Sequence, residues 1–380
     1  MRTRRNVGLL LAAVLVVGIV VAVVWGRGGS GGGGSTDLTV VEGVIGSEKK
    51  PFFDDPAVQA EFAANGYTVK VTTAGSRQIA TTADLTGVDF VFPSSAPAAL
   101  KVSQRTGVAT SYSPFYSPMA VATFAPLAPL LEEAGIVSQD GAGVWHLDVA
   151  QYLAAVRAGT RWSDLPGADT AYPSPRELLL SSTDIRSSNS AAMYLSIASY
   201  VVNGDNVVTG IEQQDAIIDE MAQLFLGQGF SASSSEDPFA DYLSQGIGSK
   251  PLVMVYEAQF LGQQMTDHDT GTAAVTPDMM LMYPSPTVLS KHTVIPLTPA
   301  GDAVGQLLMT DPALARLAAR HGFRPADPAV FASVLTDRGL AVPPTPVGVV
   351  EPPSYEVLES IIQAISDRYT SSVARNEEQP

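Results

Sequence analysis

The chain of 380 residues contains no cysteine. This absence excludes disulfide bonds, thiol catalysis and zinc–thiolate sites, and it also excludes the lipid-modified cysteine that anchors a bacterial lipoprotein. Histidine is scarce too, with only His146, His268, His292 and His321. Their positions do not have the spacing of a metal site, so we expect surface or packing roles for them and no metal or cofactor.

Positive charge is also scarce. The chain has 22 basic and 38 acidic residues, and its net charge is −16. Four basic residues and no acidic ones lie at or before Arg27, so the rest of the chain has a net charge of 18 − 38 = −20. Such a surface argues against nucleic acid and anionic membranes as partners. A small anionic ligand stays open, because a local cleft can oppose the global charge.

The motifs of common catalytic and ion-binding sites are missing as well. No GxSxG, HExxH, GxxxxGK[ST] or GxGxxG occurs where its mechanism needs it. The segment 267–278 suggests a calcium loop, but its sixth residue is Thr272 and its twelfth is Asp278, so we reject it. We therefore predict that the protein is not an enzyme. An exported hydrolase would need a nucleophile–base pair, which the sequence does not reveal.

The amino terminus carries the one long apolar run. The basic tip 1–6 precedes 19 uncharged residues, Val7 to Trp25, about the length that crosses ~30 Å of hydrocarbon. We predict a single-pass signal-anchor helix over 7–25, with residue 1 in the cytoplasm and the bulk of the chain outside. A cleaved signal peptide is the alternative, but the run is long and lacks a small-x-small cleavage site. Residues 26–36 form a Gly/Ser linker.

The part after the linker reads as an α/β protein. Strands are expected near 38–45, 67–73 and 87–92, and a helix after Asp54 or Asp55 begins with Pro56 and stops at Asn65-Gly66. This order predicts a parallel sheet covered by helices. Further helices are expected at 191–202 and 211–229, and a buried strand within 250–260. Pro-containing crossings at 116–119 and 282–286 suggest hinges between two lobes.

Several short strings resemble one family. They are "DFVFPSS" (89–95), "TDIRSSNSAAMY" (183–194) and "LAARHGFRP" (317–325), in that order after an export signal, a linker and a βαβ unit. The order resembles bacterial extracellular solute-binding proteins of the type II periplasmic-binding fold, nearest to the molybdate- or phosphate-binding branch of actinobacterial type. The resemblance implies a first lobe of 37–117 and 287–370 and a second lobe of 118–286. The last residues, 371–380, are expected to form a disordered tail.

The same resemblance implies a function. It implies a small polar or anionic ligand between the lobes and an ABC-type permease or a sensor as partner. The alternative is an envelope scaffold that reuses the fold, with a von Willebrand-type partner.

Candidate ligand contacts lie where strands end and helices begin, because helix amino termini offer free backbone N–H groups. The candidates are Ser47, Arg77, Ser94, Ser95, Ser188, Asn189, Ser190 and Tyr256. Ordinary turns, helix caps and core-edge packing are the competing interpretation of each. The run 183–190 holds more hydroxyl and amide groups than one cap requires. We expect Arg186 to pair with Asp184 or Glu177, whereas Glu257 has no clear place.

Overall fold

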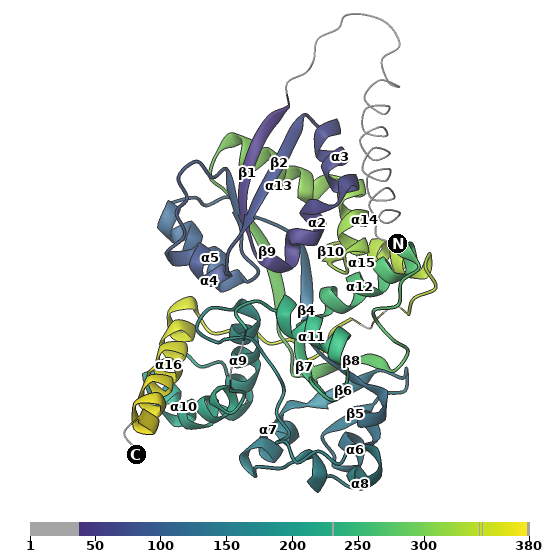
Figure 1. The fold of residues 1–380 in the computed structure, drawn as a ribbon. Helices are drawn as coiled ribbons and strands as arrows, with labels where there is room; N and C mark the ends of the chain where they lie inside the picture. The colour runs from purple at the N-terminus through teal and green to yellow at the C-terminus, as the bar shows by residue number, and fades with distance from the viewer. Residues whose placement is uncertain (1–37, 230–231, 342, 344, 378–380) are drawn as a thin grey trace, which may run out of the picture.

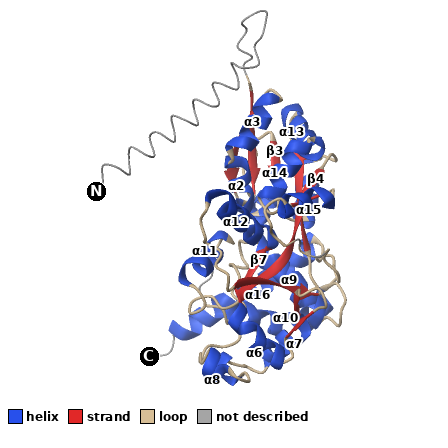
Figure 2. Ribbon diagram, turned by 90° about the vertical axis from the view of Figure 1, so that its right-hand side faces the viewer, coloured by secondary structure: helices blue, strands red, loops and turns tan. Residues whose placement is uncertain are grey.

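The structure is a computed structural model that describes residues 38–229, 232–341, 343 and 345–377. The predicted basic tip, membrane helix and linker all lie outside these residues. Within the part that is described, no helix combines the length and the apolar character needed to cross a membrane. The described chain forms two lobes stacked along one long axis, as Figures 1 and 2 show from two sides.

The first lobe is built on the predicted βαβ unit. Strands β1 (Thr39–Ile45), β2 (Tyr67–Thr73) and β3 (Phe90–Phe92) pair in parallel, and β9 (Leu289–Pro296) joins β3 in antiparallel orientation. Helix α3 (Pro56–Ala64) starts at Asp55, one of the two predicted caps, which accepts the Ala57 N–H. It ends at Asn65 and Gly66, whose φ of 90° suits glycine.

Helices cover both faces of this sheet. Val41 and Ile45 of β1 point to one core, whereas Val44 points to the other, as the two-residue period of a strand requires. The covering elements are η1 (Ser47–Lys49), α2 (Lys50–Asp54), α3, α4 (Ser76–Thr81), α5 (Ala96–Thr106), α13 (Pro299–Thr310) and α14 (Pro312–Arg320).

One long strand, β4 (Tyr112–Phe124), connects the two lobes. Its first part, to Pro118, pairs with β9, and its second part, from Met119, pairs with β7 (Val253–Tyr256) and β8 (Met279–Ser285). The change of partners falls within the segment 116–119 that the sequence proposes as a hinge. Flexing at this point stays a prediction.

The second lobe extends the sheet on the other side of β4. Strand β6 (Trp145–Asp148) runs parallel to β8, and β5 (Val137–Gln139) closes the edge. Its helices are η2 (Ala125–Leu127), α6 (Ala128–Glu133), α7 (Val149–Arg157), η3 (Trp162–Asp164), α8 (Ala168–Ala171), α9 (Asn189–Val202), α10 (Ile211–Leu226) and α11 (Glu236–Gln245). Helix α9 is buried through most of its length and forms the centre of this core.

The remaining elements join the lobes. They are α12 (Glu257–Thr270), β10 (Arg324–Pro325), α15 (Pro328–Thr336) and α16 (Tyr355–Glu377). The predicted division places 355–370 in the first lobe, but α16 packs mainly on α9 and α10 of the second, as Figure 1 shows. The reason is its apolar stripe of Leu358, Ile361, Ile362 and Ile365, which enters the second core. Helix α16 continues to Glu377, and the predicted disordered tail at 371–380 stays a prediction.

Candidate functional site

A cavity of about 210 Å³ lies between the two lobes. The first lobe lines it with the residues after β1 and β2, at the carboxyl ends of parallel strands, where α/β proteins place their ligands. The second lobe lines it with the start of α9, the segment 233–235 and Tyr256 at the end of β7. At ~30 Å³ per water molecule the cavity has room for about seven waters, so it suits a small ligand.

Three helices of the second lobe begin at this cavity. Their N-cap residues, Ser188 for α9, Ser235 for α11 and Tyr256 for α12, all line it. The Ser188 and Ser235 side chains accept no backbone N–H from their own helices. An uncapped helix start leaves backbone N–H groups and the positive end of the helix dipole available. The starts of α9 and α11 therefore place backbone donors on this wall of the cavity, whereas at α12 the Ala258 N–H already donates to the Ser117 hydroxyl.

A buried charged cluster supports the opposite wall. The Lys49 ammonium contacts Glu48 Oε1 at 2.5 Å, Ser94 Oγ at 2.7 Å and His292 Nδ1 at 3.1 Å. The Lys49 and His292 side chains are fully buried, and that of Glu48 is 6% exposed. The Ser94 hydroxyl donates to Glu48. These contacts satisfy the lysine, which also lies 5.0 Å from the ring centre of Phe92.

The charges within this cluster balance. Burial alone would raise the pKa of Glu48, but the Lys49 ammonium and the His292 hydrogen bond hold that pKa well below its usual range. Burial and the Lys49 charge lower the pKa of His292 to about 4. Burial lowers the pKa of Lys49, whereas the charge and the hydrogen bond of Glu48 oppose this change. Near neutral pH Glu48 is therefore a carboxylate beside Lys49, and His292 is a neutral imidazole. Glu48 is the only ionisable group of the cluster that lines the cavity, and its charge is neutralised by Lys49, which lies outside the lining.

Direct contacts hold the lobes together around the cavity. The Asn189 amide donates to the Ser94 carbonyl at 3.4 Å and to the Tyr256 hydroxyl at 3.1 Å. Ser47 and Ser234 hydroxyls lie 3.2 Å apart across the opening. Burial and the nearby Glu48 charge raise the pKa of Tyr256, which keeps its hydroxyl protonated. Polar groups from both lobes thus meet within one small space.

The structure brings half of the predicted site residues to the cavity. Ser47, Ser188, Asn189 and Tyr256 line it. Ser94 is buried in the charged cluster, Ser190 bonds Thr183 at 2.7 Å, and Ser95 is the buried N-cap of α5. Ligand contact at each of these positions stays a prediction.

Arg77 lies away from the cavity lining. Its guanidinium forms a forked ion pair with Glu359 of α16 and donates to the Ile185 carbonyl at 2.8 Å. The reason is that the second residue of α4 points outward from the cavity, toward α16. The Arg77 charge is therefore engaged between the lobes, and its contact with a ligand stays a prediction.

Other important residues were not among the predicted contacts. Glu48, Lys49, Ser76 and Gln78 lie at strand-to-helix junctions, next to the predicted Ser47 and Arg77. Ser234 and Ser235 precede an acidic helix start, which is a capping signal that could have revealed them. His292 had no local signal, because its partner Lys49 is 243 residues away.

Two remaining charges find ion-pair partners. Arg186 pairs with Asp184, as expected. Glu257 is fully buried and is held by Arg324 at 2.6 Å and 2.7 Å and by the Tyr283 hydroxyl at 2.7 Å. The described residues contain no group of three or more acidic or histidine side chains that could hold a metal ion.

Ser94 and Lys49 form the kind of pair that a hydrolase would need, although the sequence did not reveal it. Their geometry serves structure instead: Ser94 is 1% exposed, and its hydroxyl is already donated to Glu48. A nucleophilic oxygen must reach its substrate, and this oxygen faces the interior.

No protein-family model matches the chain. No curated protein matches its sequence either. Solved structures match the fold. A periplasmic thiamin binding protein is 14% identical, with a TM-score of 0.56 over 89% of this chain and 98% of its own. The apo ferric ion-binding protein A of Pasteurella haemolytica is 10% identical, with a TM-score of 0.53 over 87% and 98%.

The ferric binding protein of Campylobacter jejuni gives a TM-score of 0.52 at 8% identity, over 87% of this chain and 97% of its own. Identities this low show the fold alone. The molybdate- or phosphate-type branch and the actinobacterial type stay predictions. The structure therefore has the two-lobed α/β fold of the type II periplasmic solute-binding proteins.

Proposed function

We propose that the chain is a membrane-tethered, extracytoplasmic solute-binding protein. It captures a small polar or anionic ligand between its lobes and presents it to an ABC-type transporter or a sensor. The observation that supports this most directly is the cavity at which three helices begin, two of them at serines that do not cap their own helices. Hydroxyls, an amide and backbone N–H groups supply the hydrogen bonds.

The composition of the cavity narrows the ligand class. Its described lining residues include no cationic side chain, and its single carboxylate, Glu48, is paired with Lys49. An anionic group would therefore be held by helix starts and hydroxyls, as at other helix amino termini. A hydroxyl or amino group on the ligand would suit the Glu48 side. The ligand is small because the cavity is smaller than the ~300 Å³ at which drug-sized sites begin.

The first experiment identifies the ligand. Residues 36–380, freshly purified, would be examined by native mass spectrometry for a co-purified small molecule and by thermal shift against a panel of anions, sugars and amino acids. A ligand present at 100 times its Kd should stabilise the fold by about 2.7 kcal/mol. Ser188→Ala should weaken binding by roughly tenfold, whereas Ser103→Ala on α5, outside the lining, should not.

A flat screen without any co-purified ligand would count against solute binding and favour the scaffold alternative. The tether is tested separately, because it depends on residues outside the described fold. The full chain should sediment with membranes, and a chain that begins at residue 36 should be released. Release of both would contradict the signal-anchor prediction.

A further inference from the structure

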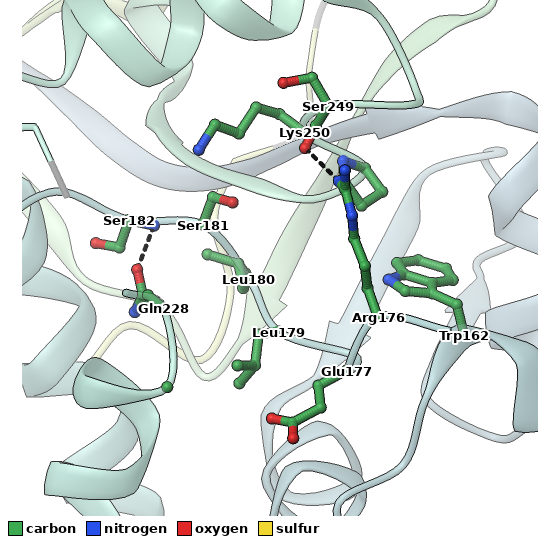
Figure 3. Close-up of a pocket in the computed structure, with 12 residues that line it drawn as sticks. Trp162, Arg176, Glu177, Leu179, Leu180, Ser181, Ser182, Gln228, Ser249 and Lys250 are labelled. Atoms are coloured by element: carbon green, nitrogen blue, oxygen red, sulfur yellow. Dashed lines mark hydrogen bonds between the residues drawn. The ribbon is translucent and has the colours of Figure 1, made fainter. Parts of the chain in front are cut away.

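A second and larger pocket lies in the second lobe. Its volume is about 510 Å³, within the range of small-molecule sites. Figure 3 shows it between the segment 176–182, the end of α10 and the turn before β7. Its residues are distinct from those that line the interlobe cavity. Hydrogen bonds from Ser181 N–H to the Leu252 carbonyl and from Met254 N–H to the Ser181 carbonyl fix one side of it.

The ionisable side chains of this pocket leave one positive charge. They are Lys250, Arg176 and Glu177, two cations and one carboxylate. Arg176 donates to the Ser249 carbonyl at 3.0 Å. Lys250 is half-buried, and its ammonium has no hydrogen-bond or ion-pair partner among the residues that the structure describes. Local positive charge is notable in a chain whose net charge is −16.

Two buried polar atoms of the pocket residues also lack a partner within the described ranges. They are the indole Nε1 of Trp162, a residue with no exposed surface, and the hydroxyl of Ser182, a residue that is 5% exposed. Buried donors are normally paired, and each exception calls for an explanation. Figure 3 shows the nitrogen edge of the indole on the side that faces the exposed side chain of Arg176.

We propose that this pocket binds a small organic carboxylate. The Lys250 ammonium would pair with the carboxylate, and the Ser182 hydroxyl and the Trp162 N–H would donate once Arg176 moves aside. Figure 3 shows Lys250 extending from one rim toward Ser181 and Ser182, so the cation and the hydroxyl lie on the same side. Leu179 and Pro251 supply apolar contact for the body of the ligand.

The charge and the size of the pocket both favour this class. One net positive charge matches a monoanion better than a phosphate dianion, because Glu177 would repel the second charge. The volume corresponds to roughly seventeen water molecules at ~30 Å³ each, which is ample for a carboxylate with a ring. An indole N–H only donates, so it suits an acceptor and not an amine.

Benzoate is the probe, titrated into the full chain in detergent by calorimetry. We expect saturable binding that Lys250→Met weakens by at least about tenfold, since a charge-assisted contact is lost. Lys70→Met, which removes an exposed lysine on β2, is the matched control and should leave the affinity unchanged. Benzylamine, with the same ring and the opposite charge, should not bind. Lys250 lacks a partner, so its loss should not unfold the chain.

An NMR measurement reports the site directly. Benzoate should shift the indole N–H resonance of Trp162 and leave that of Trp145 in place. No saturable binding, or equal affinity in Lys250→Met, would overturn the proposal. Loss of benzoate binding in Ser188→Ala but not in Lys250→Met would place benzoate in the interlobe cavity, which overturns this site while it supports the proposed function.

Discussion

Replacing Lys49 by methionine should destabilise the fold strongly. The ammonium makes three contacts, to Glu48 at 2.5 Å, Ser94 at 2.7 Å and His292 at 3.1 Å, and its side chain has no exposed surface. Removing one partner of a buried ion pair costs roughly 3–5 kcal/mol, because the remaining charge stays desolvated. His292 can offset part of this by taking up a proton, so we expect a loss of about 3 kcal/mol.

The assay is urea unfolding of residues 36–380, followed by fluorescence at about pH 8 and about pH 5. Lys49 lowers the pKa of His292, whereas Glu48 raises it, so the variant's imidazole should protonate more easily. The stability deficit of Lys49→Met should therefore be smaller at the lower pH. Lys50→Met is the adjacent control; this lysine is 49% exposed in its pair with Asp54, and its loss should cost under ~0.5 kcal/mol.

A double variant separates charge from packing. Glu48→Gln with Lys49→Met removes both charges, and such replacements of a buried pair are often neutral within a few kcal/mol. We expect the double variant to recover at least half of the loss. A Lys49→Met cost below about 1 kcal/mol, or a double variant as unstable as the single one, would refute the assignment of the lysine as counter-ion to Glu48.

Three further results are expected. Burial lowers the pKa of His292 from 6.5 to about 4, so the folded state should lose up to about 3 kcal/mol of stability as pH falls through this window. In acid unfolding curves, His292→Gln should show less of this loss. Glu359→Gln breaks the forked ion pair with Arg77, so it should cost about 1 kcal/mol in urea unfolding and raise the radius of gyration in X-ray scattering. The control is Glu356→Gln, which should do neither, because the Glu356 side chain is 61% exposed in its pair with Lys101. Affinity for an anion in the cleft should stay level or rise with salt, since salt screens the repulsion of a chain with net charge −16; a steep fall would indicate a cationic side chain in the site.

The sequence was sufficient to predict the local architecture. The helix from Pro56, a cap at Asp54 or Asp55 and the parallel arrangement of the first strands depend on residues close together in the chain, and all three were predicted. Contacts between residues far apart in the chain were not predicted. Arg77 carries no mark of its partner 282 residues away, and the apolar stripe of α16 fits a core in either lobe.

The same limit applied to the charged cluster. A lysine after a strand is typical of an exposed turn, and only the fold shows that Lys49 is enclosed by Glu48, Ser94 and His292. The crowded run 183–190 was the better guide, because an excess of hydroxyl groups is visible without knowing any partner. It supplied Ser188 and Asn189 to the cavity and Ser190 to the wall behind it.

The ionised groups around the cleft share one property. Lys49 is neutralised by Glu48, Arg77 by Glu359, and Arg324 by Glu257, so each of these cations is engaged within the protein. Charged side chains therefore set the position of the two lobes and of the helix starts between them. Under the proposed function, recognition is left to neutral donors, which would hold a ligand by geometry and not by net charge. This division would let an acidic chain offer an anion a favourable site, because backbone dipoles at the helix starts would supply the positive potential.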